Sequence, residues 1–263
     1  MRHVLTTPQD TVEGDFSTLQ RRLSRSAVLQ RLDAPDATAF WAPLPLVAVN
    51  VIADAHIPDA QAAERVTELI APFVERGHPF QWITTPSTTT PTLESTLAQA
   101  GLRAHEYPAM HASLRNPVDP CTPHDVFIDI VWPDQVAPVT TAIFNNFGHA
   151  EDLADEHLDI LETLDPETNH YFLARSLLNG MTLGAGTMHA RGDSVMLANI
   201  TVLPPARGRG LERALAATMM NRAASTGSNT ATIVANHATY ATYLELGFRT
   251  QFDVVTWVWK PHR

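Results

Sequence analysis

Apolar residues in the second half of the chain alternate between short β-branched runs and helical spacing. Such runs bounded by turn residues predict strands, and apolar positions three or four residues apart predict helices. The pairs Asn179-Gly180 and Gly192-Asp193 are typical of hairpin turns, so the three strands that they join are expected to be antiparallel neighbours. The pattern predicts strands at 127–131, 171–176, 181–190, 194–202, 230–234 and 252–259, and helices around 133–147, 152–164, 211–224 and 237–246.

The first half of the chain has a less regular pattern. Residues 1–40 are polar and predict no more than a short helix at 19–23. The order of the elements that follow favours an α/β fold. Those elements are a strand in the apolar run 43–53, a helix at 60–76 ended by Gly77, a strand at 80–84, a helix at 91–100 and a strand at 105–114.

The segment 116–123 carries three prolines in eight residues and follows a completed strand. Stretches rich in proline are typical of linkers between domains. The sequence therefore predicts two domains, residues 1–120 and residues 121–263.

The two predicted domains end in a similar way. In each, a strand and a helix lead to a glycine and an apolar residue, Gly101-Leu102 and Gly247-Phe248, and then to another strand. This similarity favours an internal repeat, although the same order of elements is common in α/β proteins without one.

Composition and charge narrow the class of protein. Of the 263 residues 44% are apolar and 17% charged, which is typical of a globular protein with its own core. The formal net charge of -10 argues against a surface that tracks nucleic-acid phosphates, and it suits an amine substrate. Cys121 is the only cysteine and the histidines show no metal-binding spacing. No apolar stretch approaches the roughly 20 residues that cross a bilayer, and residues 1–4 do not begin a signal peptide. We therefore expect a cytoplasmic protein that binds no metal, membrane or nucleic acid.

The segment 203–212 joins a predicted strand to a predicted helix and contains Arg207-Gly208-Arg209-Gly210. The first turn of a helix offers unpaired backbone N–H groups and the positive end of the helix dipole, which together attract an anion. Glycines let a phosphate approach the backbone, and arginines add charge and donors. The sequence lacks the G-K-[ST] of a nucleotide P-loop, and the hairpin strands before the loop do not form the βαβ unit of a dinucleotide fold. The loop therefore predicts a site for a pyrophosphate.

Two signatures in this half resemble those of the GNAT superfamily of N-acetyltransferases. Val202-Leu203-Pro204 and the loop match the family's Val-x-Pro and Q/R-x-x-G-x-G/A pattern at a strand-to-helix junction. Asn236, Tyr243, Gly247 and Phe248 match the second signature, with Thr239 where alanine is usual. Glu212 stands at the last position of the first signature, where the family has glycine or alanine. Its carboxylate either points to solvent or weakens cofactor binding.

The resemblance implies a GNAT fold of α+β type, with a mixed, mostly antiparallel central sheet flanked by helices, arranged as two tandem domains. It also implies coenzyme A as the carrier of the acyl group. In the family, the strand before the loop pairs with the pantetheine arm, the loop binds the pyrophosphate, and the tyrosine protonates the leaving thiolate. The residues expected to bind the cofactor are Ile200, Thr201, Val202, Arg207, Gly208, Arg209, Gly210, Leu211, Glu212 and Asn236.

Tyr243 is the expected catalytic acid, with Tyr240 as the alternative one helical turn earlier. No base is assigned, because the strands at 197–202 and 230–234 contain no carboxylate. His189 has a suitable reference pKa near 6.5, yet a single histidine on a strand is more often structural. A chain of waters, or an amine that binds already neutral, would serve as well.

The expected reaction is direct transfer of an acetyl group from acetyl-CoA to a primary amine in a ternary complex. An acyl-enzyme is not expected, because Cys121 lies in the predicted linker. The alternative is an acyl-CoA-binding or interaction module without catalysis. The acceptor is expected to be a small molecule or a peptide, and homodimerisation stays open. The first copy should neither bind cofactor nor catalyse, since residues 57–60 replace the glycine loop and Leu97 replaces the tyrosine.

Overall fold

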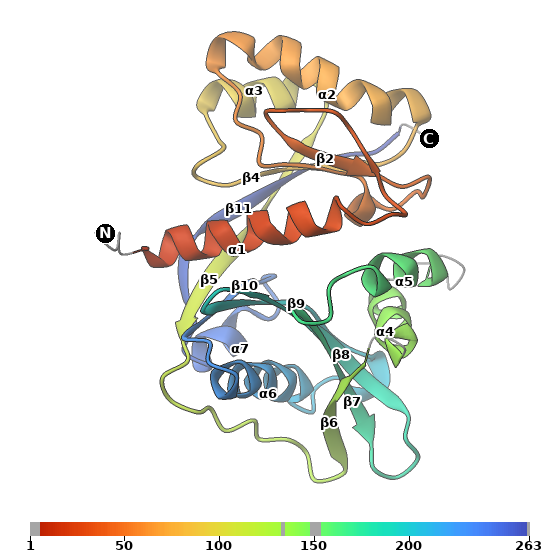
Figure 1. The fold of residues 1–263 in the computed structure, drawn as a ribbon, viewed down its shortest axis with the longest axis vertical. Coiled ribbons are helices and arrows are strands. Elements are labelled where there is room, and N and C mark those ends of the chain that lie inside the picture. Colours follow the sequence, from red (N-terminus) through yellow and green to blue (C-terminus); the bar gives the residue numbers. More distant parts are fainter. Residues whose placement is uncertain (1–5, 133–134, 148–153, 262–263) are drawn as a thin grey trace. The chain divides into compact units, whose positions relative to one another are not determined.

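The computed structural model describes residues 6–132, 135–147 and 154–261 (Figure 1). The chain divides into two compact units. The C-terminal unit comprises residues 1–15 and 109–251, and the N-terminal unit comprises residues 16–108 and 252–263. Each unit therefore contains segments from both ends of the chain.

The C-terminal unit is built on a sheet in the order β5-β10-β9-β8-β7-β6. All neighbouring strands are antiparallel except β9 and β10, which are parallel. The strands are the end of β5 (Arg103–Ser113), β6 (Val126–Val131), β7 (Asn169–Ser176), β8 (Thr182–Arg191), β9 (Ser194–Val202) and β10 (Thr230–Val234). The antiparallel arrangement predicted for the three hairpin strands is confirmed.

Four helices accompany this sheet, with α4 and α5 on one side of β6 to β9 and α6 and α7 on the other (Figure 1). They are α4 (Ala137–Phe147), α5 (Ala154–Glu162), α6 (Leu211–Ser225) and α7 (Tyr240–Glu245). Helix α6 is buried on more than the single face that its spacing predicts, because Ala216, Ala217 and Ala223 are enclosed together with Leu215 and Met219. Small alanine side chains let the helix lie close against the sheet.

The N-terminal unit has its strands in the order β1-β2-β3-β4-β11. Its core lies between this sheet and helices α2 and α3, around Trp82, Phe73, Phe80 and Leu97. The elements are α1 (Pro8–Leu23), whose first residues belong to the C-terminal unit, β1 (Gln30–Arg31), β2 (Thr38–Trp41), β3 (Val51–Ala53), α2 (Ala62–Arg76), β4 (Phe80–Thr84), α3 (Pro91–Gln99) and β11 (Arg249–Trp259).

Three expectations for this half were wrong. Residues 1–40 were expected to hold no strand, but β1 lies within them and β2 begins at Thr38. The short helix expected at 19–23 is a 16-residue helix, α1. The strand expected in the apolar run 43–53, after its prolines, is confined to β3, and residues 47–49 form a 3₁₀ turn instead. Prolines before the turn cannot donate to a strand ladder. The buried amide of Asn50 holds the loop, since it bonds the backbone of Ala42, Leu44 and Pro79.

The last strand of each half completes the sheet of the other unit. Strand β11 pairs antiparallel with β4 of the N-terminal half, and the end of β5 pairs antiparallel with β10 of the C-terminal half. The proline-rich segment 116–123 falls inside the C-terminal unit. There, Val118 exchanges two backbone-to-amide hydrogen bonds of 2.9 and 2.7 Å with Asn221 of α6.

The two halves also end their matching helices in the same way. After α3, the Leu102 N–H donates to the Leu97 carbonyl at 3.1 Å, and after α7 the Phe248 N–H donates to the Tyr243 carbonyl at 3.0 Å. Gly101 and Gly247 both adopt positive φ, 86° and 93°, which glycine tolerates best. Helix α2 ends in the same way, with the His78 N–H donating to the Phe73 carbonyl at 3.2 Å, so the internal repeat stays a prediction from the sequence.

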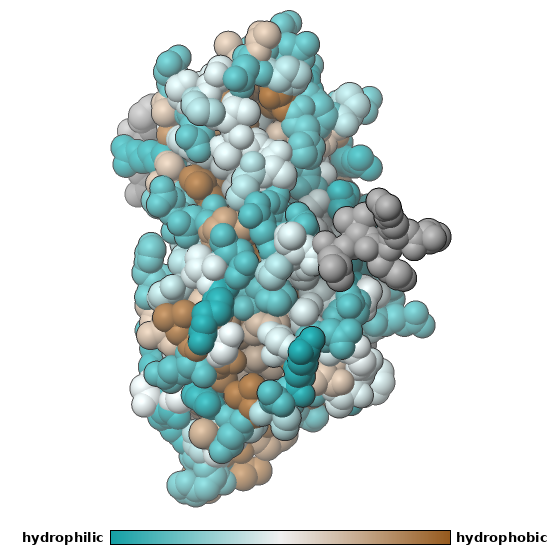
Figure 2. All heavy atoms as spheres, turned by 90° about the vertical axis from the view of Figure 1, so that its left-hand side faces the viewer, coloured by the Kyte–Doolittle hydropathy of each residue, from teal (hydrophilic) through white to brown (hydrophobic). Residues whose placement is uncertain are grey.

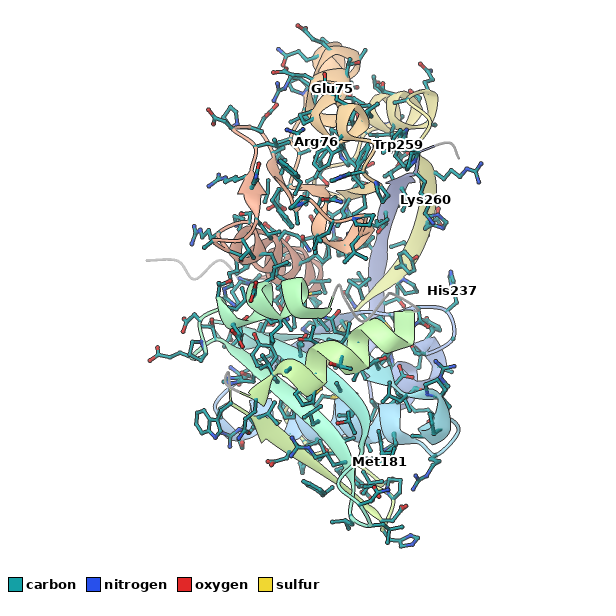
Figure 3. All side chains as sticks on the ribbon, turned by 90° about the vertical axis from the view of Figure 1, so that its right-hand side faces the viewer. Glu75, Arg76, Met181, His237, Trp259 and Lys260 are labelled. Carbon is teal, nitrogen blue, oxygen red and sulfur yellow. The ribbon has the colours of Figure 1, made fainter. Side chains whose placement is uncertain are left out.

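Within the described residues, no helix has both the length and the apolar character needed to cross a membrane. On the face drawn in Figure 2, hydrophilic residues cover most of the surface and hydrophobic residues form small patches between them. At the end of α2, Arg76 (labelled in Figure 3) lies with its guanidinium 4.2 Å from the centre of the Trp41 ring. This cation–π contact belongs to the N-terminal unit.

Candidate functional site

One edge of strand β9 is left open in the C-terminal unit. The parallel pairs between β9 and β10 run from Ser194–Thr230 to Leu197–Ile233, whereas β9 continues to Val202. The backbone of Ile200, Thr201 and Val202 therefore has β8 on one side and no β10 partner on the other. An unpaired strand edge offers N–H and C=O groups to an extended ligand.

A β-bulge lies where this open edge begins. The register between β8 and β9 shifts between the pairs Ala185–Thr201 and Thr187–Ala198. Asn199, within the bulge, has φ of 52°, which asparagine tolerates better than most residues. Gly184 supports the same region, because a Cβ there would lie 2.6 Å from the Thr201 carbonyl oxygen. The bulge and the close packing of β8 fix the direction of the open edge.

The loop after β9 leads into the start of α6 through two glycines with positive φ. Gly208 has φ of 75°, and Gly210, the N-cap of α6, has φ of 77°. A Cβ added at either glycine would meet no atom within 4 Å, so these positions require glycine for its backbone conformation and lie beside open space. No side chain caps α6. Its first N–H groups are therefore available to an anion.

The two arginines of the loop are exposed and already have partners. Arg207 donates from Nε to the Val202 carbonyl oxygen at 3.3 Å, which folds it back towards β9. Arg209 pairs with Asp125 at 2.5 Å, and this ion pair lowers the pKa of Asp125. A phosphate bound at the loop would compete with the Asp125 carboxylate for Arg209.

Tyr243 lies almost fully buried on α7, and its hydroxyl donates to Glu212 Oε1 at 2.9 Å. Burial and the neighbouring Glu212 carboxylate raise the pKa of Tyr243 well above its usual value near 10. Burial also raises the pKa of Glu212, against the opposing effect of its hydrogen bonds from Tyr243 and Thr239. Glu212 therefore does not point outward to solvent, the first of the two expectations for it, but accepts a hydrogen bond from buried Tyr243.

Asn236 and Tyr240 lie near this pair in the sequence but have other contacts. The Asn236 Oδ1 atom accepts a hydrogen bond from the Thr239 N–H at 3.0 Å, which closes the turn before α7. The Tyr240 hydroxyl lies 3.1 Å from Thr250 Oγ1 on the surface. Asn236 is exposed and so stays accessible to a ligand.

His189 is buried on β8, and both of its ring nitrogens have partners. Nδ1 lies 2.6 Å from Asn169 Oδ1, and Nε2 lies 3.1 Å from Thr187 Oγ1. The Thr187 hydroxyl also lies 3.2 Å from the Ala198 carbonyl and receives the Asn199 amide at 3.3 Å. This geometry fits the structural alternative considered for His189. The network links the histidine to the bulge at Asn199.

A buried carboxylate that the sequence did not single out lies elsewhere in the same unit. Asp15 of α1 accepts hydrogen bonds from Ser194 Oγ at 2.5 Å and Thr232 Oγ1 at 2.9 Å. Its other oxygen pairs with Arg191 Nε at 2.6 Å, and its side chain is 1% exposed. These three partners satisfy the charge. The cluster fixes the start of α1 to β9 and β10.

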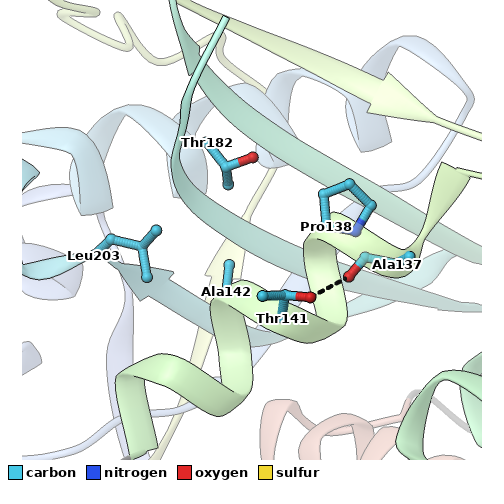
Figure 4. A pocket seen from close by; sticks show the side chains of 6 residues that line it. All are labelled: Ala137, Pro138, Thr141, Ala142, Thr182 and Leu203. Carbon is cyan, nitrogen blue, oxygen red and sulfur yellow. Dashed lines mark hydrogen bonds between the residues drawn. The ribbon is translucent and has the colours of Figure 1, made fainter. Parts of the chain in front are cut away.

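A shallow apolar pocket of about 290 Å³ lies beside Leu203, at the end of β9 where the loop begins (Figure 4). Figure 4 shows α4 on its other side, where the Thr141 hydroxyl donates to the Ala137 carbonyl at 3.0 Å. The remaining lining residues are Pro138, Ala142 and Thr182. In the part of the chain that the structure describes, no group of three or more histidine, cysteine, aspartate or glutamate residues could hold a metal ion.

Comparison with known protein families identifies the segment that contains this site. Residues 130–248 match the family described as acetyltransferase (GNAT) family. That segment contains the open edge of β9, the glycine loop and the Tyr243–Glu212 pair. Residues 130–248 therefore carry a GNAT-family domain, and the enzyme class that this domain defines is acyltransferase. A comparison with curated protein sequences finds no match.

Solved structures support the same fold over most of the chain. A GCN5-related N-acetyltransferase from Kribbella flavida is 15% identical, with a TM-score of 0.70 over 96% of each chain. Its counterpart from Sphaerobacter thermophilus is 16% identical, with a TM-score of 0.66 over 97% of this chain and 90% of its own. A tandem GNAT protein from the clavulanic acid biosynthesis pathway is 13% identical, with a TM-score of 0.51 over 75% of this chain and 69% of its own. The GNAT fold expected from the two signatures is confirmed.

Proposed function

We propose that the C-terminal unit transfers an acetyl group from acetyl-CoA directly to a primary amine in a ternary complex. The observation that carries this proposal is the open edge of β9 beyond Leu197, which leads into the uncapped start of α6. An extended arm with amide groups fits the first feature, and a pyrophosphate fits the second. Coenzyme A combines both.

Several residues fit this cofactor. The main chain of Ile200, Thr201 and Val202 would bond the pantetheine arm, and the loop 207–212 would bind the pyrophosphate. Asn236 is exposed in the turn before α7 and would bind the cofactor through its amide.

The bound thioester would supply an acyl carbon that forms a C–N bond to the amine as its C–S bond breaks. Overall, an ammonium and the thioester give an amide, a thiol and one proton. Tyr243 would protonate the leaving sulfur, because a phenol is protonated at neutral pH and can donate that proton as the thiolate leaves. To do so its hydroxyl must turn from Glu212. The nitrogen loses two protons in all: one leaves through water without an assigned base, and the other restores the Tyr243 phenol.

An alternative function is acyl-CoA binding without catalysis. The hydrogen bond from Tyr243 to Glu212 favours this reading, because it holds the only buried phenol of the site on a carboxylate. The alternative predicts a cofactor affinity like that of an enzyme but no thiol release with any amine.

Two measurements test the proposal. Isothermal titration of acetyl-CoA into the full chain should give saturable binding, and the absence of binding would overturn both functions. Thiol release should then be followed over a panel of polyamines, amino acids, aminoglycosides and peptides. Turnover with one class of amine supports the enzyme, whereas binding without turnover on every amine supports the alternative.

The N-terminal half is proposed to be a degenerate copy, with residues 1–120 as one domain and 121–263 as the other. It would neither bind cofactor nor catalyse. The cytoplasmic location and a homodimer stay predictions from the sequence.

A further inference from the structure

Glu212 is an acidic residue, whereas the two charged residues just before it, Arg207 and Arg209, are basic. It is the second residue of α6, two positions beyond the N-cap Gly210, so it lies within the first turn of the helix. Its partners are not cations. In the described part of the chain, the two groups hydrogen-bonded to it are the hydroxyls of Tyr243 and Thr239, which are both neutral.

The cations nearest in sequence are engaged elsewhere. Arg209 pairs with Asp125, Arg213 donates to the Asp119 carbonyl at 2.5 Å, and Arg207 donates to the Val202 carbonyl. The half-buried Glu212 carboxylate is therefore held by neutral hydroxyl groups, and none of these three arginines forms an ion pair with it. An anion bound at the same helix start would add negative charge close to it.

We propose that Glu212 makes cofactor binding proton-linked, so that the loop binds coenzyme A more tightly when this carboxylate carries a proton. This inference rests on the proposed function and concerns the regulation of the same site. Protonated Glu212 can still accept the hydrogen bond from Tyr243, while its own O–H adds a donor. Protonation therefore removes a repulsion and keeps the Tyr243 contact.

The sign of the linkage follows from the charges. Burial raises the pKa of Glu212 in the free protein. A bound pyrophosphate favours the neutral acid further, so the pKa rises again in the complex. Binding then takes up a proton between these two pKa values. The affinity increases as the pH falls through the pKa of the complex, and stops increasing below that of the free protein.

The test is titration calorimetry of coenzyme A into the full chain and into Glu212→Gln, at several pH values and in buffers of different ionisation enthalpy. We expect wild type to take up a proton on binding. Glu212→Gln should bind roughly five- to tenfold more tightly above neutral pH and lose most of that uptake. The coenzyme's own phosphates titrate in both proteins, so the difference between them isolates Glu212.

Glu245→Gln is the matched control, because Glu245 is an exposed carboxylate at the end of α7. It should keep the wild-type affinity and proton uptake. Glu212→Ala, the residue type common in the family, should reproduce Glu212→Gln and guards against a misfolded variant. Equal affinity and proton uptake in wild type and Glu212→Gln would overturn this inference but leave the proposed function standing. Failure of both proteins to bind coenzyme A would overturn the proposed function as well.

Discussion

Helices α2 and α6 occupy matching places in the two halves but begin differently. Helix α6 follows Gly208 and Gly210, both with positive φ. Helix α2 follows a 3₁₀ turn, residues 59–61, in which Gln61 donates its N–H to the Pro58 carbonyl at 2.8 Å. A proline and an acidic residue stand where the C-terminal half has its glycines and arginines.

Helices α3 and α7, which precede Gly101 and Gly247, also differ in the side chain that each one buries. Leu97 and Tyr243 occupy the same place in the shared helix end and are both buried. Leu97 lies in the core of the N-terminal unit. Tyr243 also joins the core of its unit, but it carries a hydroxyl that bonds Glu212. The two halves therefore share a helix end and differ in the side chain buried there, which is apolar in one half and carries a hydrogen-bonded hydroxyl in the other.

Replacement of Tyr243 by phenylalanine should have the largest effect. If the phenol is the acid, Tyr243→Phe should lower kcat by about 10²–10⁴-fold and change the affinity for acetyl-CoA little. Stopped-flow or steady-state assays of thiol release measure the first quantity, and calorimetry the second. Tyr240→Phe is the control, since the Tyr240 hydroxyl lies on Thr250 at the surface. A loss of turnover in Tyr240→Phe instead would assign the acid to Tyr240.

Replacing Gly210 by valine tests whether the glycine loop binds the cofactor. The same replacement at Gly77, in the N-terminal half, is the control. A β-branched residue is strained at φ of 77°, so Gly210→Val should distort the start of α6 and weaken coenzyme A binding about 10- to 100-fold. Gly77→Val places the same strain at φ of 64°, at the end of α2. It should lower stability and leave binding unchanged. Equal loss of binding in both variants would contradict a site confined to the C-terminal half.

Replacing Asp15 by asparagine, and Asp54 in the same way, compares a fully buried carboxylate with a more exposed one. Asp15→Asn should cost about 1.5–3 kcal/mol of unfolding free energy, because it removes the charge from a fully buried group with three donors. Asp54→Asn should cost less, since Asp54 is 18% exposed and lies 3.7 Å from Arg21. Urea denaturation measures both values. A larger loss at Asp54 would show that the Asp15 cluster is not an important anchor of α1.

The smallest effect is expected at Asp125. Asp125→Asn removes the ion pair of Arg209 and leaves the arginine available to a phosphate, so coenzyme A should bind about two- to threefold more tightly. The effect should shrink in high salt, which screens exposed charges. Calorimetry at two salt concentrations measures it. Weaker binding would mean that Asp125 orients Arg209 for the cofactor.

The sequence predicted the C-terminal half well, because its strands are β-branched runs joined by recognisable hairpin turns. Strand β10 was predicted with both of its ends, and so was the start of α6 at Leu211. Helix α1 was predicted too short, although its start has a signal in the sequence. Thr7 and Asp10 exchange hydrogen bonds in a capping box, with Pro8 as the first helical residue.

Other features depend on packing between distant segments. Glu212 and Tyr243 are 31 residues apart, and the pattern of the sequence could identify both but not their hydrogen bond. Asp15 meets Ser194 and Thr232 only because the start of α1 packs on the C-terminal unit, 179 and 217 residues further along the chain. The exchanged strands β5 and β11 were likewise predicted as strands, but local periodicity carries no information about their partners.

The number of coenzyme A molecules bound per chain tests the central claim most directly. Calorimetric titration of the full chain should give one site, which Gly210→Val weakens and Gly77→Val leaves intact. Two sites per chain would show that the N-terminal half also binds the cofactor. A single site that survives Gly210→Val unchanged would place it away from the glycine loop, and either result would contradict the account.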